Sequence, residues 1–175
     1  INEVQSGNRL VLSNIENGGM SIKLLDGVPR FNVWVGSDYA TAASSTALTV
    51  GKKTRITGTY DGKTICLYVV GKLVAQKTPT GSFGQTQDNT VMAIGANPKG
   101  NGVNDGFVNM NVYYVKIHNQ ALTASEVAES AEINSKIWDV SASKDKSILA
   151  WVKYTSASFT DSTKPLVAYI ASDNS

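Results

Sequence analysis

The side chains that could perform acid–base or nucleophilic chemistry are few in this sequence. His118 is the only histidine, Cys66 is the only cysteine, and the nucleophile-elbow pattern G-x-S-x-G does not occur. A catalytic set needs a nucleophile, a base and a group that orients the base. We therefore interpret His118 as a polar residue on a strand face. Cys66 is interpreted as an ordinary strand residue, since one cysteine allows neither an intramolecular disulfide nor a multi-cysteine zinc site.

The glutamates do not form a hydrolytic pair either. Glycoside hydrolysis generally uses two carboxylates that flank the scissile bond. The glutamates of this chain are Glu3, Glu16, Glu126, Glu129 and Glu132. Three of them fall in a predicted helix, and none belongs to an E-x-D-x-E-like strand. The sequence therefore predicts a protein that is not an enzyme, and a glycoside hydrolase fragment ranks last among the functions that we consider.

Aromatic side chains offer a different chemistry, because sugar sites usually combine an aromatic platform with side-chain amides. Trp34 and Tyr68 both fall on the outward side of their predicted strands by alternation, and they could stack on a sugar ring if those strands share a sheet. Tyr39, in a loop of small residues, is a further candidate. The alternative is that Trp34 and Tyr68 are covered by the helix or by the C-terminal segment.

Composition bounds the class of protein. The chain has 175 residues, of which 42% are hydrophobic and 17% charged, and its net charge is +2. A chain of this length can bury a core without disulfides. The Lys and Arg residues form no cluster that would bind nucleic acid, and no apolar run approaches the ~18 residues of a membrane span. We therefore predict no nucleic-acid partner and no membrane insertion.

Residues 54–76 are the stretch around which the other elements are arranged. Residues 54–60 and 64–70 alternate with a period of two, which is typical of strands with one buried face. Asp61-Gly62 lies between them and predicts a type I′ hairpin turn. Val70-Gly71 then turns the chain into a third run, so this stretch predicts an antiparallel meander.

The remaining chain is predicted to be mainly strands and loops, with a hairpin signal at Asp26-Gly27. Further strands are predicted at residues 9–12, 20–25, 30–35, 46–50, 91–95 and 107–118. Loops are predicted at residues 36–45, 78–89 and 97–106. A helix is predicted at residues 126–137, because Thr123 and Glu126 have the spacing of a capping box.

The meander string G-T-Y-D-G-K-T-I-C-L-Y-V-V-G-K resembles the central hairpins of laminin G-like domains, which are concanavalin A-like and related to pentraxins. M-A-I-G-A-N and N-V-Y-Y-V-K-I-H-N-Q-A-L are similar to later strands of that family. The family usually has Trp and His before the first meander strand, where this chain has Lys53 and Thr54. It usually has Asn before the second turn glycine, where this chain has Val70.

The resemblance implies an all-β fold, a two-sheet antiparallel jelly-roll sandwich with one short helix and a C-terminal β segment. It also implies a possible calcium site on the sandwich rim, since such domains often bind calcium through loop oxygens. The candidate ligands are Asp88, Asn89, Asn97, Asn101, Asn104 and Asp105. The alternative is that these residues are only turn formers. No cofactor other than calcium is predicted.

The predicted organisation is a laminin G-like sandwich at residues 1–129, a helix end and linker at 130–137, and a short β segment at 138–175. The string W-D-V-S-A-S-K-D-K-S-I-L-A-W-V resembles the start of a module in BspA-like bacterial surface proteins. Strands are expected at residues 148–153 and 166–170. The chain begins at Ile1 with no visible signal peptide, and we expect it to be a piece of a longer polypeptide.

The sequence and the resemblance together favour a non-catalytic recognition or adhesion module of a larger bacterial surface, secreted or phage virion protein. Its partner would be a glycan or a protein on a cell surface or within a virion. The alternative is a structural or assembly domain, such as a phage capsid or tail decoration, whose edge strands join neighbouring subunits. An oligomer is compatible with either function.

Overall fold

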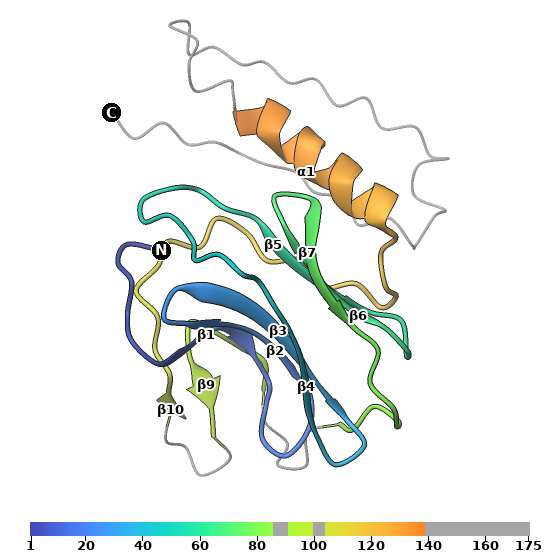
Figure 1. The fold of residues 1–175 in the computed structure, drawn as a ribbon. Coiled ribbons are helices and arrows are strands. Elements are labelled where there is room, and N and C mark those ends of the chain that lie inside the picture. Colours follow the sequence, from blue (N-terminus) through green and yellow to red (C-terminus); the bar gives the residue numbers. More distant parts are fainter. Residues whose placement is uncertain (86–90, 100–103, 139–175) are drawn as a thin grey trace, which may run out of the picture. The chain divides into compact units, whose positions relative to one another are not determined.

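The protein is an all-β, two-sheet antiparallel jelly-roll sandwich with one helix, as predicted (Figure 1). The computed structural model describes residues 1–85, 91–99 and 104–138. The predicted strands at residues 148–153 and 166–170, and the predicted β segment that contains them, lie outside the described residues apart from Trp138.

One sheet has five strands in the order β4-β3-β2-β1-β8, and every neighbouring pair is antiparallel. The strands are β1 (Asn8–Ser13), β2 (Met20–Leu25), β3 (Val28–Val35), β4 (Asp38–Ala43) and β8 (Ala93–Ile94). The second sheet has the order β5-β6-β7 and is the predicted meander. Its strands are β5 (Ile56–Tyr60), β6 (Ile65–Val69) and β7 (Lys72–Lys77). A further strand pair joins β9 (Asn97–Pro98) to β10 (Asn104–Asp105).

The hydrophobic core lies between the two sheets. It contains alternate residues of β3, β4 and β6, with partly buried residues of β2, β5 and β7 packed against them. The fully or nearly buried core side chains are Phe31, Val33, Val35, Ala40, Ala42, Ile65 and Leu67. Gly58 allows the sheets to approach here, because a Cβ at this position would collide with the Phe31 ring. Alternation therefore identified the inward faces of the central strands correctly.

The hairpin turns differ in how well their residue types suit the backbone angles that they adopt. Asp26 (φ 52°) and Gly27 (φ 80°) link β2 to β3 with the two positive φ angles of a type I′ turn, as predicted. Val70 (φ 49°) and Gly71 (φ 76°) do the same between β6 and β7, although a β-branched residue disfavours this region. The type I′ turn predicted at Asp61-Gly62 is wrong: residues 61–64 form a longer loop between Tyr60 and Ile65, and only Gly62 has a positive φ. There the Asp61 carboxylate accepts hydrogen bonds from the backbone N–H groups of residues 63 and 64.

Helix α1 (Ala124–Trp138) begins with the predicted capping box. The Glu126 N–H donates to the Thr123 hydroxyl at 3.3 Å, and the Thr123 N–H donates to the Glu126 carboxylate at 2.7 Å. Val127 is fully buried, and the helix contacts β7 and the turn that precedes it (Figure 1). A Cβ on Gly71 would lie 2.7 Å from the Ala131 Cβ, so glycine lets the turn approach the helix.

Four predicted elements are wrong. The stretch 97–106, predicted as a loop, contains the paired strands β9 and β10. The small-residue stretch 36–45, predicted as a loop, contains β4, because Ala40 and Ala42 fill the core opposite β3. Residues 46–50 form no strand, although a strand was predicted. The predicted closing strand at residues 107–118 has no strand assignment either, and its start makes only scattered hydrogen bonds, such as Val108 N–H to the Gly95 carbonyl. Short alternating stretches cannot reveal whether a neighbouring strand is within bonding distance.

Candidate functional site

Trp34 and Tyr39 lie side by side at one end of the five-stranded sheet. They are a directly opposed pair on β3 and β4, so both side chains project from the same face. Their ring centroids are 4.8 Å apart and their planes meet at 84°, which is an edge-to-face contact. Both side chains are partly buried and neither belongs to the core between the sheets. The structure thus brings together two of the three predicted aromatic candidates.

Hydrogen bonds to three loops hold this aromatic pair in place. The Tyr39 hydroxyl donates to the Gly18 carbonyl at 2.8 Å and accepts from the Gly18 N–H at 3.2 Å. The Trp34 indole N–H donates to the Gly36 carbonyl at 3.1 Å. Gly84 lies so close to the Trp34 ring that a Cβ would collide with it. The rings therefore have a fixed orientation before any partner arrives.

Burial raises the pKa of the Tyr39 hydroxyl, and the nearby negative charges of Glu16 and Asp38 raise it further, whereas the hydrogen bond with Gly18 lowers it. The phenol consequently stays protonated at neutral pH and keeps its donor to Gly18. The two carboxylates lie close enough to the Tyr39 hydroxyl to act on it electrostatically.

Tyr68 does not lie beside Trp34 and Tyr39. Trp34 and Tyr68 could stack on one sugar ring only if their strands shared a sheet, and β3 and β6 belong to different sheets. Tyr68 lies on β6 of the three-stranded sheet and is only 5% exposed. Desolvation raises the pKa of its hydroxyl, with a smaller contribution from the neighbouring Cys66, and Thr59 is a hydrogen-bond partner. Alternation correctly placed Tyr68 on the face away from the core, but that face is buried. Tyr68 could contact a ligand only if the structure rearranged to expose its side chain.

The described candidates for calcium are Asn97, Asn104 and Asp105. The Asp105 carboxylate forms an ion pair with Lys99, which lowers the pKa of Asp105. The Asn97 side-chain carbonyl already accepts a hydrogen bond from the Ser13 hydroxyl at 3.1 Å. A calcium site generally needs six or more oxygen ligands with several carboxylates.

These described groups do not fit a calcium ion, because their single carboxylate is neutralised by a lysine and a side-chain amide oxygen is engaged. The described residues hold no cluster of three or more His, Cys, Asp and Glu side chains that could bind a metal ion. Asp88, Asn89 and Asn101 lie outside the described residues, so calcium binding that includes them stays a prediction.

The outer face of the five-stranded sheet is polar, a feature that the sequence analysis did not use. Ser13, Ser21 and Asn32 share this face through the register of β1, β2 and β3, and all are buried. The Asn32 side-chain nitrogen donates to the Ser21 hydroxyl, at a long 3.4 Å. Its carbonyl oxygen is buried and has no partner among the described residues. The alternation of Arg30, Asn32 and Trp34 against a hydrophobic inner face was the signal available in the sequence.

Lys23 and Arg30 continue the same outer face beyond Asn32. They are directly opposed on β2 and β3, and both are partly buried. Burial lowers the pKa of Lys23, and the charge of Arg30 lowers it further. A cavity of about 370 Å³ adjoins Lys23. Its lining residues are Ser6, Gly7, Asn8, Arg9, Leu10, Ile15, Lys23, Asn97, Asp105 and Gly106.

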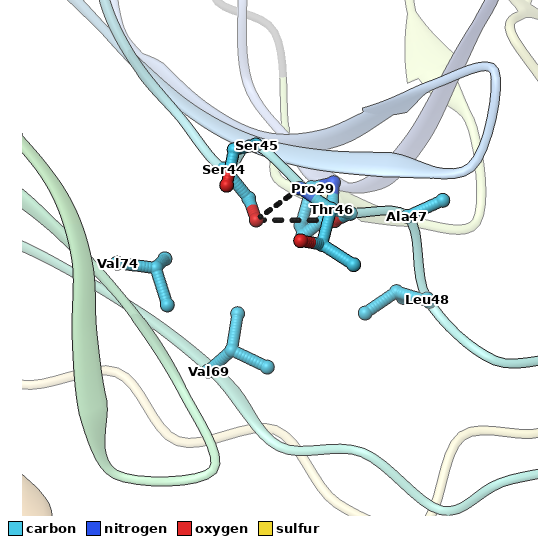
Figure 2. A pocket seen from close by; sticks show the side chains of 8 residues that line it. All are labelled: Pro29, Ser44, Ser45, Thr46, Ala47, Leu48, Val69 and Val74. Atoms are coloured by element: carbon cyan, nitrogen blue, oxygen red, sulfur yellow. Dashed lines mark hydrogen bonds between the residues drawn. The ribbon is translucent and has the colours of Figure 1, made fainter.

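A second cavity, of about 300 Å³, opens at the edge between the sheets (Figure 2). Apolar side chains, among them Leu48, Val69 and Val74, face it from the β6–β7 hairpin and the loop after β4. Ser44 shapes that loop, since its hydroxyl accepts from the Thr46 N–H and donates to the Thr46 carbonyl. No charged residue and no aromatic ring lines this cavity. We therefore interpret it as a shallow gap in the packing and not as a ligand site.

Comparison with known proteins agrees with this architecture. Residues 1–128 match the laminin G-type family described as the concanavalin A-like lectin/glucanases superfamily. The chain belongs to this family. The family is therefore established over the whole sandwich and the start of α1.

Other comparisons add little. The crystal structure of residues 221–444 of an S-layer domain-containing protein from Clostridium thermocellum ATCC 27405 is similar at 18% identity, with a TM-score of 0.33. That match covers 75% of this chain and 66%, just under two thirds, of the other. No curated protein sequence matches the chain. Among the described residues there is no helix long and apolar enough to cross a membrane.

Proposed function

We propose that this chain is a non-catalytic carbohydrate-recognition module of an extracellular or cell-surface protein. The observation that carries the proposal is the Trp34–Tyr39 pair, two partly exposed rings held edge to face at an end of the sandwich. Sugar rings stack on such platforms, while neighbouring polar groups bind their hydroxyls. Membership in a superfamily of lectins and glucanases supports this choice.

The surroundings of the two rings suit recognition rather than catalysis. Tyr39 is tied to Gly18, and the Trp34 backbone is tied to Gly19 and Gly84, so little conformational entropy is lost on binding. The Glu16 and Asp38 carboxylates lie near enough to influence the Tyr39 hydroxyl. In this proposal the exposed Asp38 carboxylate accepts a hydrogen bond from a sugar hydroxyl.

The test is a glycan array followed by calorimetry with a neutral oligosaccharide that binds. Trp34→Ala is expected to weaken binding at least tenfold, because a stacked aromatic ring is removed. Tyr113→Ala removes a half-exposed ring far from the site in sequence and is expected to change affinity less than twofold. Trp34→Phe, which retains a ring, and Tyr39→Ala serve if Trp34→Ala does not fold. The proposal is wrong if folded wild-type protein binds no glycan, or if the Trp34 and Tyr39 variants bind like wild type.

A second candidate is an assembly domain, in a surface layer or a virion, that joins neighbouring subunits. It is favoured by segment 107–117, which forms no strand and contains several exposed apolar side chains. These are Phe107, Val112, Tyr113, Val115 and Ile117, the last of them 67% exposed. Native mass spectrometry of the purified chain tests this function. A defined oligomer that Ile117→Asp dissociates supports it, and a monomer at all concentrations contradicts it.

A further inference from the structure

The opposed pair of cations on β2 and β3 needs an explanation. Lys23 and Arg30 face each other across the strands, and like charges in that position repel. Their neighbours Ile22 and Phe31 point into the core, so the two cations point away from it. Neither has an acidic ion-pair partner in the described part of the chain. The arrangement costs stability in the free protein.

The nearby acidic groups are engaged elsewhere. Asp105, which lines the adjoining cavity, is paired with Lys99. Glu16 accepts a hydrogen bond from the Asn97 side chain at 2.8 Å. Arg9 adds another cation to the cavity lining. Positive charge is therefore in excess around this cavity, although the whole chain is close to neutral.

Two buried polar atoms without partners lie on the same outer face as the cations. The Arg30 Nε and the Asn32 side-chain carbonyl oxygen are buried, and neither has a hydrogen-bond partner among the described residues. Asn32 is 2% exposed and lies two positions from Arg30 on the same face of β3. Buried polar groups without partners are rare, and each one calls for an explanation such as a missing ligand or water.

We propose that Lys23 and Arg30 bind an oxyanion carried by an acidic glycan. This inference rests on the proposed carbohydrate function and names its ligand class. A guanidinium offers paired donors that match carboxylate, sulfate or phosphate geometry, and an ammonium adds a point charge. The anion relieves the repulsion between the two cations. The adjoining cavity of about 370 Å³ has room for a sugar unit and is lined by polar groups of Ser6, Asn8 and Asn97.

The cations and the aromatic pair lie toward opposite ends of the same outer face of β3. Arg30 and Trp34 lie on the same face of β3, separated by Asn32. A strand rises about 3.3 Å per residue, so their Cα atoms are roughly 13 Å apart. Because Asn32 between them is only 2% exposed, the anion site and the aromatic pair are two separate contact points.

The test measures binding of carboxylated, sulfated and phosphorylated oligosaccharides by calorimetry, each alongside its neutral parent, with inorganic phosphate and sulfate as free-anion probes. Lys23→Gln and Arg30→Gln are compared with Lys63→Gln, which removes the same charge from an exposed turn. We expect at least one acidic probe to bind tenfold more tightly than its parent. Lys23→Gln and Arg30→Gln should each abolish that tenfold preference, and Lys63→Gln should change it less than twofold.

Several outcomes overturn the inference. An equal loss in Lys63→Gln would mean general attraction to a polyanion, and inorganic phosphate binding as tightly as the glycan would mean a free-anion site. Preference for no acidic probe would also end it. If neutral glycans still bind in a Trp34-dependent way, only this inference fails and the proposed function stands. The melting temperature of Lys23→Gln should equal or exceed that of wild type, so lost binding cannot be ascribed to unfolding.

Discussion

The two sheets of the sandwich share one core but differ in their outer faces. On the three-stranded sheet the outward Tyr68 is buried, and the α1 helix, with its fully buried Val127, packs against the adjoining β7 and turn. On the five-stranded sheet the outward residues Lys23, Arg30 and Trp34 remain partly exposed. The middle of this second outer face is also buried, at Ser13, Ser21 and Asn32, so we propose that recognition uses its partly exposed ends.

This difference teaches how far a period of two can be interpreted. Alternation separates the two faces of a strand, but it does not say what lies against the outward face. Tyr68 is only 5% exposed on its outward face, whereas Trp34 is partly exposed, beside Tyr39 and the loops around Gly19 and Gly84. Trp34 and Tyr68, which both point outward by alternation, therefore differ in their exposure to solvent.

The largest expected effect comes from the core that both sheets share. Leu67→Ala should lower the free energy of unfolding by about 3 kcal/mol, because a fully buried leucine is replaced by a cavity. Leu73→Ala, on the exposed strand β7, should cost less than about 0.5 kcal/mol. Urea denaturation measures both. Similar losses in the two variants would show that the core is not where we place it.

A smaller effect should separate the two outer faces. Val127→Ala is expected to cost about 1–2 kcal/mol, since buried methyl groups are lost while helix propensity improves slightly. Hydrogen exchange should speed up in β6 and β7 and stay unchanged in β2 and β3. Glu129→Ala, at an exposed position of the same helix, is the control. Equal acceleration in both sheets would mean that α1 is not a cover for only one of them.

The two type I′ turns can be tested by opposite substitutions, each of which should change the free energy of unfolding by about 1 kcal/mol. Val70 has φ 49° and is 53% exposed, so Val70→Asn should stabilise the protein by about 1 kcal/mol through relief of backbone strain. Asp26→Val, which places a β-branched residue at φ 52°, should destabilise it by a similar amount. Thermal unfolding measures both variants. Two changes of the same sign would contradict the turn assignment.

The smallest effect concerns the start of the helix. Hydrogen bonds from Thr123 lower the pKa of Glu126, and the charge of His118 lowers it slightly more. Because the folded-state pKa is lowered, this carboxylate stabilises the fold above its ordinary pKa of about 4.3 and stops doing so as pH falls through the folded value. The melting temperature of wild type should exceed that of Glu126→Gln at pH 7, and the difference should vanish in acid. A difference that is the same at both pH values would refute the charged cap.

The sequence was sufficient for the meander, the Asp26-Gly27 turn and the capping box, because each depends on local geometry. It could not predict β4, whose alanines become core residues only when β6 lies opposite them. It also could not predict that residues 107–118 would form no strand, since strand pairing depends on a distant neighbour.

For the site, the sequence identified Trp34 and Tyr39 separately but not their contact. That contact depends on the β3–β4 register, and the predicted loop at 36–45 concealed it. The opposed cations Lys23 and Arg30 were overlooked because the pairing of β2 with β3 was not followed residue by residue. The register of β2 with β3 brings them together, although an Asp-Gly turn three residues from each of them could have indicated it.

The central claim is that recognition takes place on the outer face and loop end of the five-stranded sheet. An amide ¹H–¹⁵N chemical-shift titration with a glycan that binds on the array tests it most directly. We predict that the perturbed amides lie in the loops around Gly18 and Gly36 and along β2 and β3, while those of α1 and β7 stay unchanged. Perturbations concentrated in α1, in β7 or in residues 107–117 would contradict the claim.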